Sequence, residues 1–280
     1  MSGSFLVALD LDRTLIYSAG SAGPDAPADA RVVEMYDGAP LSRMTQRSWA
    51  LLGDLIDRAE VVPVTTRSIA QYQRVGWPRV PRHAICTNGG ALLVDGVPDP
   101  AWRAESLALA AESAPLAELN AVLAAVAHEP WVKLVRDVED LFCYLVAHSR
   151  EAIPEAWVAE LEVVAARARW TVSVQGRKVY VVPAALGKGS AVERLRRRLP
   201  DGSATVTLAS GDSLLDAGLL VVADHGLRPA HGELHESGWT SPHVAVTRNA
   251  GILAGEEILA WALGHVASSA PVEVSAPVPS

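Results

Sequence analysis

An apolar run near the N-terminus, FLVAL at residues 5–9, is followed by two acids, Asp10 and Asp12. A short continuous apolar run bounded by polar residues is typical of a strand that is buried on both faces, as in a parallel sheet covered by helices. Ligands bind beyond the carboxyl ends of such strands. Because side chains alternate along a strand, both carboxylates are expected on one side of it. The alternative is a solvated loop in which Asp10 only caps the chain.

The same pattern recurs along the chain and predicts an α/β fold. Apolar runs at residues 61–65, 83–87, 204–209 and 244–247 predict further strands. Helices are predicted at about 42–59, from 68, and at 189–199, 214–221 and 252–266. A polar loop is expected at residues 18–40. Strands that alternate with helices indicate a Rossmann-like, doubly wound parallel sheet.

The middle of the chain has a different character. Strands are predicted there at residues 91–94, 131–135, 141–147, 171–174 and 179–182, and helices at 114–128 and 155–169. This order predicts an α+β module inserted into the first domain. The predicted division is a core of residues 1–90 and 184–267, a module of residues 91–183, and a disordered tail of residues 268–280, which is rich in Ser, Pro, Val and Ala.

Further candidate residues lie at the ends of predicted strands or at the starts of predicted helices. Thr65, Thr66 and Arg67 follow a strand, where a hydroxyl could donate to a phosphate oxygen. A helix N-cap at Thr66 or Ser68 is an equal alternative. Lys188 lies between two glycines at a helix start. It could neutralise carboxylates and a phosphoryl group together, or be an ordinary exposed lysine.

Acids also follow the predicted strand at residues 204–209. Asp212 and Asp216 are four residues apart and share a face if the segment is helical. Hard carboxylate oxygens of this kind suit Mg²⁺. The alternative is that Asp212 is a helix N-cap.

Taken in order, the DxDxT pattern at residues 10–14, Thr65, Lys188 and the GDxxxD pattern at residues 211–216 resemble the haloacid dehalogenase (HAD) superfamily of phosphatases. The position of the α+β module and the sequence ICTNGG at residues 85–90 resemble subfamily IIB. That branch contains Cof-type sugar phosphatases, sucrose-phosphate phosphatase and mannosyl-3-phosphoglycerate phosphatase. The resemblance covers nearly the whole chain outside the tail, and it implies that the module is a C2-type cap.

The resemblance implies a Mg²⁺-dependent phosphomonoester hydrolase that works through an aspartyl-phosphate. Asp10 would be the nucleophile, and Asp12 would protonate the leaving oxygen and then deprotonate water. The residues assigned to phosphate binding are Thr65, Thr66, Arg67 and Lys188. The metal candidates are Asp10, Asp12 through its backbone carbonyl, Asp212, and Asp216 in a supporting position.

Three positions depart from the family pattern. Arg13 stands where a small residue, often Gly, is common, and Thr66 stands where Gly is frequent. Leu215 stands where Asn is frequent in this branch. Because the core acids and the lysine are present, we still expect activity.

The cap is expected to determine specificity, and its cations would suit a second anionic group on the substrate. The substrate candidates are Asn88, Lys133, Arg136, Arg177 and Lys178, with solvated surface charges as the alternative. The expected partner is a small phosphorylated metabolite, such as a sugar phosphate or phosphoglycerate derivative. The sequence leaves open a phosphomutase or phosphoryl transferase, a non-catalytic ligand-binding protein, and the oligomeric state.

Composition narrows the possible binding partners and the cellular location. The formal net charge of −8 argues against a broad basic surface for nucleic acid. Two cysteines without metal-ligand spacing fit a reducing compartment, and apolar runs are too short to span a bilayer. We therefore expect a cytoplasmic protein without nucleic-acid or membrane partners. Tryptophans 102, 131, 157 and 170 are expected in the core of the module, and histidines 225, 231 and 235 on a surface loop.

Overall fold

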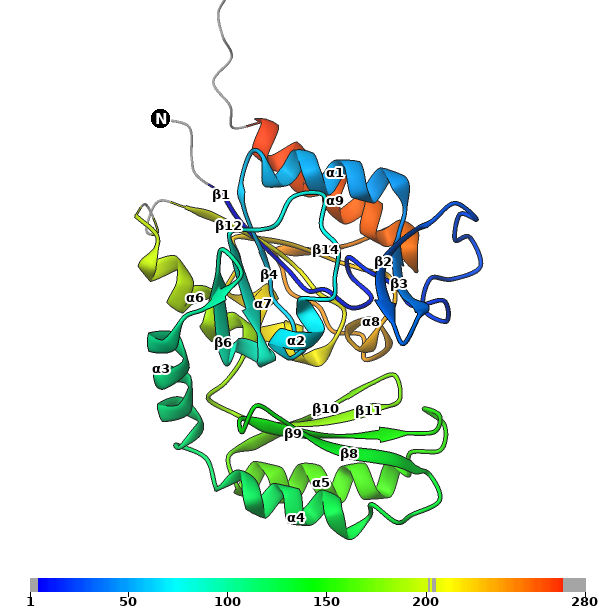
Figure 1. Cartoon of the computed structure of the whole chain (residues 1–280), viewed down its shortest axis with the longest axis vertical. Coiled ribbons are helices and arrows are strands. Elements are labelled where there is room, and N and C mark those ends of the chain that lie inside the picture. The colour runs from blue at the N-terminus through cyan, green and yellow to red at the C-terminus, as the bar shows by residue number, and fades with distance from the viewer. Residues whose placement is uncertain (1–4, 201, 203–204, 269–280) are drawn as a thin grey trace, which may run out of the picture.

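The computed structural model describes residues 5–200, 202 and 205–268, and Figure 1 shows two bodies joined side by side. The larger body holds both ends of the described chain, and the smaller one is formed by the middle of the sequence. Of the tail predicted as disordered at residues 268–280, Ser268 instead ends a helix, and residues 269–280 lie outside the described residues. Residue 204, where a strand was predicted to start, also lies outside them. None of the described helices is long and apolar enough to cross a membrane.

A five-stranded parallel sheet forms the centre of the larger body. Its order is β14-β13-β12-β1-β4, and its strands are Val244–Val246, His225–Arg228, Val206–Ser210, Phe5–Leu9 and Glu60–Pro63. This confirms the predicted α/β class. Strand β1 is an inner strand between β12 and β4, so its carboxyl end, where Asp10 follows, is flanked by the carboxyl ends of two neighbouring strands.

Helices cover both faces of this sheet, and β1 contributes to both cores. Phe5, Val7 and Leu9 belong to one buried cluster, whereas Leu6 and Ala8 belong to another. This alternation explains why the strand is apolar throughout. Helices α1 (Gln46–Ile56) and α9 (Ile252–Ser268) supply side chains to the first cluster, and α6 (Lys188–Arg198) and α7 (Ala217–Val221) supply the second.

The segment before α1 differs from the prediction. Residues 18–40 are not all loop, because β2 (Arg31–Tyr36) pairs with β3 (Ala39–Met44) in an antiparallel hairpin. The helix predicted from residue 42 begins at Gln46, since Thr45 is its N-cap and accepts a hydrogen bond from Ser48 N. Strand β3 therefore takes the residues that helical periodicity had assigned to the helix.

Strands β5 (His83–Cys86), β6 (Ala91–Val94) and β7 (Val97–Pro98) form a separate antiparallel sheet beside β4. Helix α3 (Pro100–Ala110), which was not predicted, follows it. Trp102 of α3 packs in the second core cluster of the larger body, so its predicted place in the module is wrong. The division at residue 91 stays a prediction, and these contacts favour starting the module after α3.

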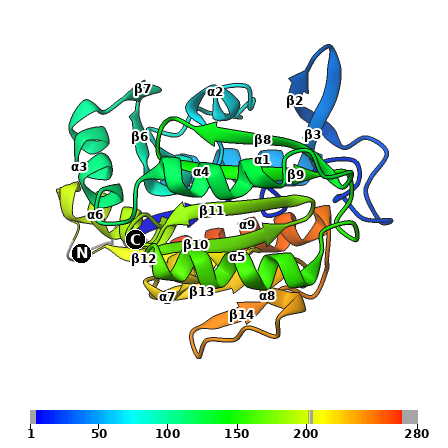
Figure 2. The ribbon, with the colours of Figure 1, turned by 90° about the horizontal axis from the view of Figure 1, so that it is seen from below.

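The smaller body is an antiparallel sheet with order β10-β11-β9-β8 and two helices on its outer face (Figure 2). We call this unit the cap. Its strands are β8 (Val132–Val138), β9 (Phe142–Ala147), β10 (Trp170–Gln175) and β11 (Lys178–Pro183), and its helices are α4 (Leu116–Ala125) and α5 (Glu155–Arg167). Strands β10 and β11 face the larger body (Figure 1).

Short helical segments complete the fold around the carboxyl edge of the parallel sheet. They are α2 (Ile69–Tyr72), η1 (Thr87–Gly89), η2 (Leu214–Asp216) and α8 (Glu233–Glu236). The loop expected around the histidines is wrong in part, because His225 begins β13 and His235 lies in α8. Strand β13 was missed because HGLR is short and polar at both ends.

Candidate active site

Asp10 and Lys188 meet in the buried centre of the site. Lys188 Nζ lies 2.5 Å from Asp10 Oδ1 and 2.5 Å from Asp216 Oδ1. All three side chains are buried. Burial disfavours the ammonium of Lys188, but the two carboxylates outweigh burial and raise its pKa. The lysine is therefore a fixed positive charge, and the alternative of an ordinary exposed lysine is wrong.

Close packing holds Lys188 in this place. A Cβ atom on Gly189 would lie 2.3 Å from the backbone oxygen of Gly218, so only glycine allows α6 to approach α7 this closely. The second oxygen of Asp216 accepts hydrogen bonds from Ser213 N at 2.9 Å and Ser213 Oγ at 2.7 Å. Both oxygens of Asp216 are thus engaged, and this carboxylate supports the lysine.

A group of acids surrounds the lysine. Asp10, Asp212 and Asp216 each offer an oxygen atom, and these atoms lie within 4.8 Å of one another. Burial and the charge of Asp216 raise the pKa of Asp10, and burial and the charge of Asp10 raise the pKa of Asp212 well above its ordinary value. One ammonium cannot neutralise three carboxylates. Hard oxygen donors with excess negative charge fit a divalent cation such as Mg²⁺.

The turn after Asp10 explains one departure from the family pattern. Arg13 has a φ of +64°, in the left-handed region where a residue without a Cβ atom is least strained. Its Nε lies 3.4 Å from Asp212 Oδ2, so the side chain turns toward the acids. Thr14 Oγ1 donates to Asp10 Oδ2 at 3.0 Å, which fixes the orientation of that carboxylate.

The predicted phosphate ligands lie at the same edge of the sheet. Thr65 and Thr66 follow β4 and are buried, and Thr65 Oγ1 accepts a hydrogen bond from Arg67 N. Thr66 lies on the wall of the cavity described below. The alternative of a helix cap at Thr66 or Ser68 is confirmed at Ser68, which is the N-cap of α2.

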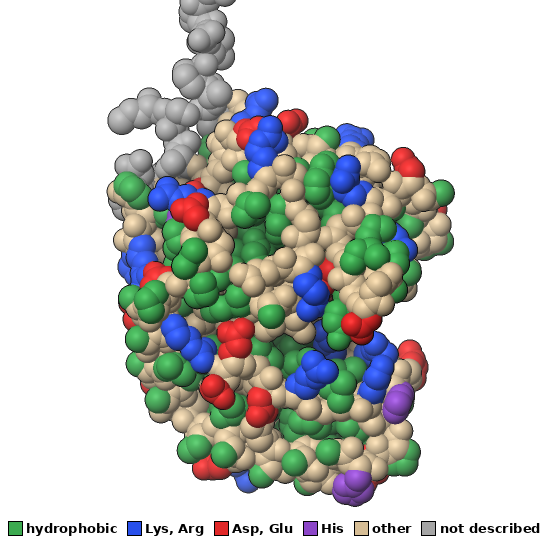
Figure 3. Space-filling model, in the orientation of Figure 1, with side chains coloured by type: hydrophobic (Ala, Val, Ile, Leu, Met, Phe, Trp, Pro, Cys, Tyr) green, Lys and Arg blue, Asp and Glu red, His purple; other side chains and the backbone are tan. Residues whose placement is uncertain are grey.

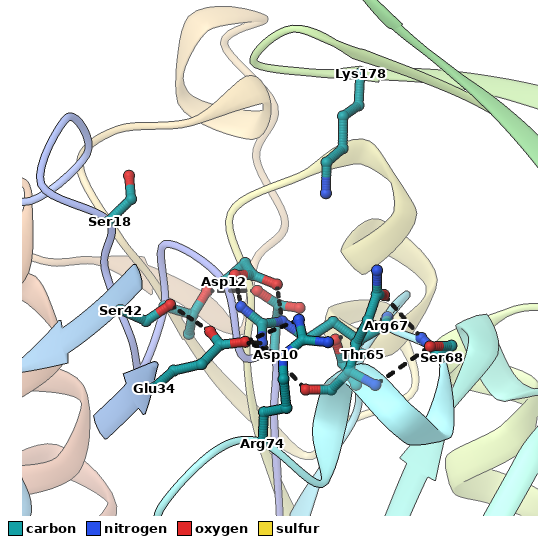
Figure 4. A network of polar contacts seen from close by, with 12 residues as sticks. Asp10, Asp12, Ser18, Glu34, Ser42, Thr65, Arg67, Ser68, Arg74 and Lys178 are labelled. Carbon is teal, nitrogen blue, oxygen red and sulfur yellow. Dashed lines mark hydrogen bonds and ion pairs between the residues drawn. The ribbon is translucent and has the colours of Figure 1, made fainter. Parts of the chain in front are cut away.

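Arg67 contacts the second acid of the DxD pair. Its Nε lies 2.7 Å from Asp12 Oδ2, and its Nη2 lies 2.8 Å from Asp12 Oδ1, a bidentate arrangement (Figure 4). Partial burial works against ionisation of Asp12, but the charge of Arg67 outweighs it and holds the pKa of that carboxyl below its usual range. Asp12 is 46% exposed at its side chain and faces the cavity, whereas Asp10 lies deeper.

Sequence reasoning missed the residues behind Arg67. Glu34 of β2 lies 2.9 Å from Arg67 Nη1 and 3.1 Å from Arg74 Nη2, and Ser42 Oγ of β3 donates to it at 2.7 Å. Glu34 sits in a segment predicted to be loop, with no adjacent motif. The available signal for a strand with a special acid was Glu34 directly after two valines in the segment RVVEMY.

A cavity of about 470 Å³ lies between the larger body and the cap. Figure 3 shows the surface hollowed between the two lobes, with Lys and Arg side chains near its mouth. From the larger body the cavity is lined by Asp12, Arg13, Ile16, Ser18, Gly20, Ser21, Leu41, Ser42, Thr66, Arg67 and Asp212; from the cap by Gln175, Gly176, Arg177, Lys178 and Tyr180. Four cations and two acids line it, which suits a polar, anionic ligand.

The predicted cap residues separate into two groups. Lys178 points from the β10–β11 hairpin toward Asp12 (Figure 4), and Arg177 lies beside it on the cavity wall. Lys133 and Arg136 are exposed on edge strand β8, outside the described residues that line the cavity. Asn88 is buried and donates to the backbone oxygen of Leu186 at 3.3 Å, so it ties β5 to the chain returning from the cap.

Glu233 of α8 joins the cap to the acid loop. It accepts hydrogen bonds from Ser173 Oγ at 2.9 Å and Val174 N at 3.1 Å in β10, and from Leu214 N at 2.9 Å. Leu215, another departure from the family pattern, packs against the hydrophobic cluster of the cap. The loop that carries Asp212 and Asp216 is therefore in direct contact with the cap.

Comparison with known proteins supports the fold. No protein-family model and no curated protein sequence matches the chain. Among solved structures, it is similar to the sucrose-phosphatase of Synechocystis in complex with sucrose and phosphate, with a TM-score of 0.63, 16% identity, and coverage of 95% of this chain and 98% of that one.

Two further solved structures have a similar fold. The C-terminal domain of Candida albicans trehalose-6-phosphate phosphatase has a TM-score of 0.59 and 14% identity, covering 94% of this chain and 93% of that one. A HAD subclass IIB sugar phosphatase has a TM-score of 0.60 and 11% identity, and the match covers 94% of this chain and 100% of that one. This chain has the fold of HAD subclass IIB phosphatases, as its motifs predict.

Proposed function

We propose that this protein is a Mg²⁺-dependent phosphatase that hydrolyses a small phosphorylated metabolite, a sugar phosphate or phosphoglycerate derivative, through an aspartyl-phosphate on Asp10. The observation that carries the proposal is the buried Asp10 carboxylate, held by Lys188 at 2.5 Å and adjacent to Asp212. Asp12 lies two residues further on and lines the cavity. A nucleophile, an acid–base group and fixed positive charge are the parts that such a hydrolysis needs.

The residues divide the reaction into two steps. Asp10 would attack phosphorus while Asp12 gives a proton to the departing oxygen. Asp12 would then take a proton from the water that attacks the aspartyl-phosphate, which releases phosphate and restores Asp10. For the first step Asp12 must carry a proton, which the negative charge of a bound phosphoryl group favours. Lys188 and Thr65 would hold the phosphoryl oxygens, with Thr66 at the cavity wall.

Mg²⁺ would be held by Asp10, Asp212 and the backbone carbonyl of Asp12, with Asp216 supporting through Lys188. When bound, the ion supplies positive charge that offsets the transferring phosphoryl group. The excess of buried carboxylates over ammonium groups supports this assignment.

The substrate class rests on the cavity and on the similar structures. The similar structures include phosphatases named for sucrose phosphate and trehalose 6-phosphate. Arg177 and Lys178 on the cavity wall are the cap residues we assign to the substrate, with Arg13 opposite them. This charge would bind the phosphate and the polar remainder of a small ester.

Phosphate release tests the proposal. Wild type, Asp10→Asn and the exposed control Asp54→Asn would be assayed with p-nitrophenyl phosphate and a panel of phosphorylated sugars, glycerates and nucleotides, with Mg²⁺ or with EDTA. We expect Mg²⁺-dependent release by the wild type and the control but not by Asp10→Asn. Mg²⁺-dependent release that is equal in Asp10→Asn would contradict Asp10 as the nucleophile. Absence of release for every ester would contradict a phosphatase and favour a ligand-binding protein. Transfer to a sugar hydroxyl in preference to water would favour a phosphomutase.

A further inference from the structure

Glu34 is a buried carboxylate on the β2–β3 hairpin, next to residues that are exposed. Its side chain is 0% exposed, whereas the neighbouring Met35 and Tyr36 are each 49% exposed. Burial of a carboxylate is unfavourable unless it is paired and hydrogen-bonded. Two arginines and Ser42 satisfy it here. Packed apolar side chains in place of the whole group, Glu34 with its two arginines, would often be as stable or more stable, so stability alone does not account for this buried charge.

The contacts of Glu34 lead to Asp12 through one guanidinium. Glu34 Oε1 is 2.9 Å from Arg67 Nη1, while the Nε and Nη2 atoms of the same guanidinium hold both oxygens of Asp12. Because the guanidinium is planar and rigid, fixing one of its nitrogens fixes the direction of the others. Arg67 is thus held from behind by Glu34 and holds Asp12 in front.

We propose that Glu34 is a positioning residue that, through Arg67, fixes the carboxylate of Asp12 for its two proton transfers. The inference rests on the proposed function. In that function, Asp12 gives a proton to the leaving-group oxygen while the bond between that oxygen and phosphorus breaks. Asp12 then takes a proton from the water whose oxygen bonds to phosphorus as the Asp10–phosphorus bond breaks. Arg67, first predicted to bind phosphate, acts in this scheme on the acid.

Leaving groups of different basicity separate this role from general loss of structure. p-Nitrophenolate leaves without needing a proton, whereas the alkoxide of a sugar phosphate needs one. We expect Glu34→Gln to lower kcat/KM for the best alkyl phosphate of the panel by about tenfold or more, as is typical when general acid catalysis is impaired. For p-nitrophenyl phosphate, kcat/KM should hold nearly constant. Its kcat should fall, with a burst of p-nitrophenol, because the second step still needs Asp12.

Matched variants complete the test. Glu60→Gln, which removes a paired carboxylate at the opposite end of β4, should leave both esters unaffected. Glu34→Asp keeps the buried charge. It should lower kcat/KM for the alkyl phosphate less than Glu34→Gln does, again with little change for p-nitrophenyl phosphate. This variant serves as the test if Glu34→Gln fails to fold. In an Arg67→Lys background, Glu34→Gln should add little, because the bidentate link is already lost.

Equal losses of kcat/KM for the two esters, no loss for either, or additive losses in the double variant would overturn the role of Glu34. Absence of Mg²⁺-dependent turnover in the wild type would overturn the proposed function and this inference with it. The two failures are therefore distinguishable.

Discussion

Lys188 and Asp10 are 178 residues apart in the chain, yet Lys188 Nζ lies 2.5 Å from Asp10 Oδ1. Lys188 opens α6 after the return from the cap, and Asp10 directly follows β1, an inner strand of the sheet. The same ammonium contacts Asp216, so it is the positive centre of the buried acids. Folding of the two halves of the larger body around the cap insertion therefore assembles the site.

Replacing this ammonium should destabilise the protein. Lys188→Met keeps similar length but leaves three carboxylates buried together, and loss of one partner of a buried ion pair costs about 3–5 kcal/mol. Denaturant titration of the variant should show this loss without Mg²⁺ and a smaller loss with it. Arg47→Met, whose side chain is 69% exposed, is the control and should change stability little. An unchanged unfolding free energy for Lys188→Met would contradict the assigned charge balance.

Mg²⁺ should stabilise the wild type through Asp212. A ligand at a hundred times its dissociation constant adds about 2.7 kcal/mol to the unfolding free energy. Thermal melts should therefore shift upward with Mg²⁺ in the wild type but not in Asp212→Asn. Without Mg²⁺, Asp212→Asn should melt above the wild type, because burial and Asp10 disfavour its charge. The same Mg²⁺ shift in both proteins would place the ion elsewhere.

Loss of the Glu233 carboxylate should loosen the cap. Glu233→Ala removes hydrogen bonds to Ser173, Val174 and Leu214, and bonds to a charged group contribute about 1.5–3 kcal/mol each. Hydrogen exchange of the Val174 amide should become faster, and KM should rise. Glu236→Gln, exposed on the same helix, should exchange like the wild type. Unchanged protection of β10 in Glu233→Ala would show that other contacts hold the cap.

His231 should make stability depend on pH. It lies 2.8 Å from the Arg13 backbone oxygen through Nε2 and accepts from Gly251 N through Nδ1, which requires the neutral ring. Burial lowers its pKa below 6.5. Because the unfolded state binds the proton more readily, the stability from neutral His231 is present above pH 6.5 and is lost as pH falls through the lowered pKa.

Comparison of two glutamine variants tests this effect. The stability difference between wild type and His231→Gln should decline below pH 6.5, whereas exposed His128→Gln should show no such trend. A pH-independent difference for His231→Gln would mean that the ring does not titrate as described.

The parallel sheet could be predicted because its signals are local. The strand at residues 5–9 is apolar and buried throughout, the strand at residues 206–210 is largely apolar and buried, and polar residues follow both at one edge of the sheet. Asp10, Lys188 and Asp212 could be predicted as site residues for the same reason. In a parallel sheet the carboxyl ends of the strands, and the starts of the helices that follow them, lie at the same edge.

The elements that were missed depend on tertiary contacts. Strand β2 forms because its partner β3 follows and because Arg67 and Arg74 neutralise Glu34, which no local pattern shows. Helix α3 has a regular N-cap, Asp99 before Pro100, but its alanine-rich sequence has little amphipathic contrast. Lys133 and Arg136 could not be told from Arg177 and Lys178, because only the order of the cap strands decides which hairpin faces the cavity.

Phosphoryl transfer to Asp10 is the central chemical step of the proposed function, and trapping tests it most directly. The protein would be mixed with substrate and Mg²⁺, quenched in acid and reduced with borohydride, which converts an aspartyl-phosphate to homoserine, and its peptides would be sequenced by mass spectrometry. We predict homoserine at position 10, dependent on Mg²⁺, and more of it in Asp12→Asn because the second step is slowed. Phosphate release by the wild type with no homoserine at position 10, or with homoserine at another aspartate, would contradict Asp10 as the nucleophile.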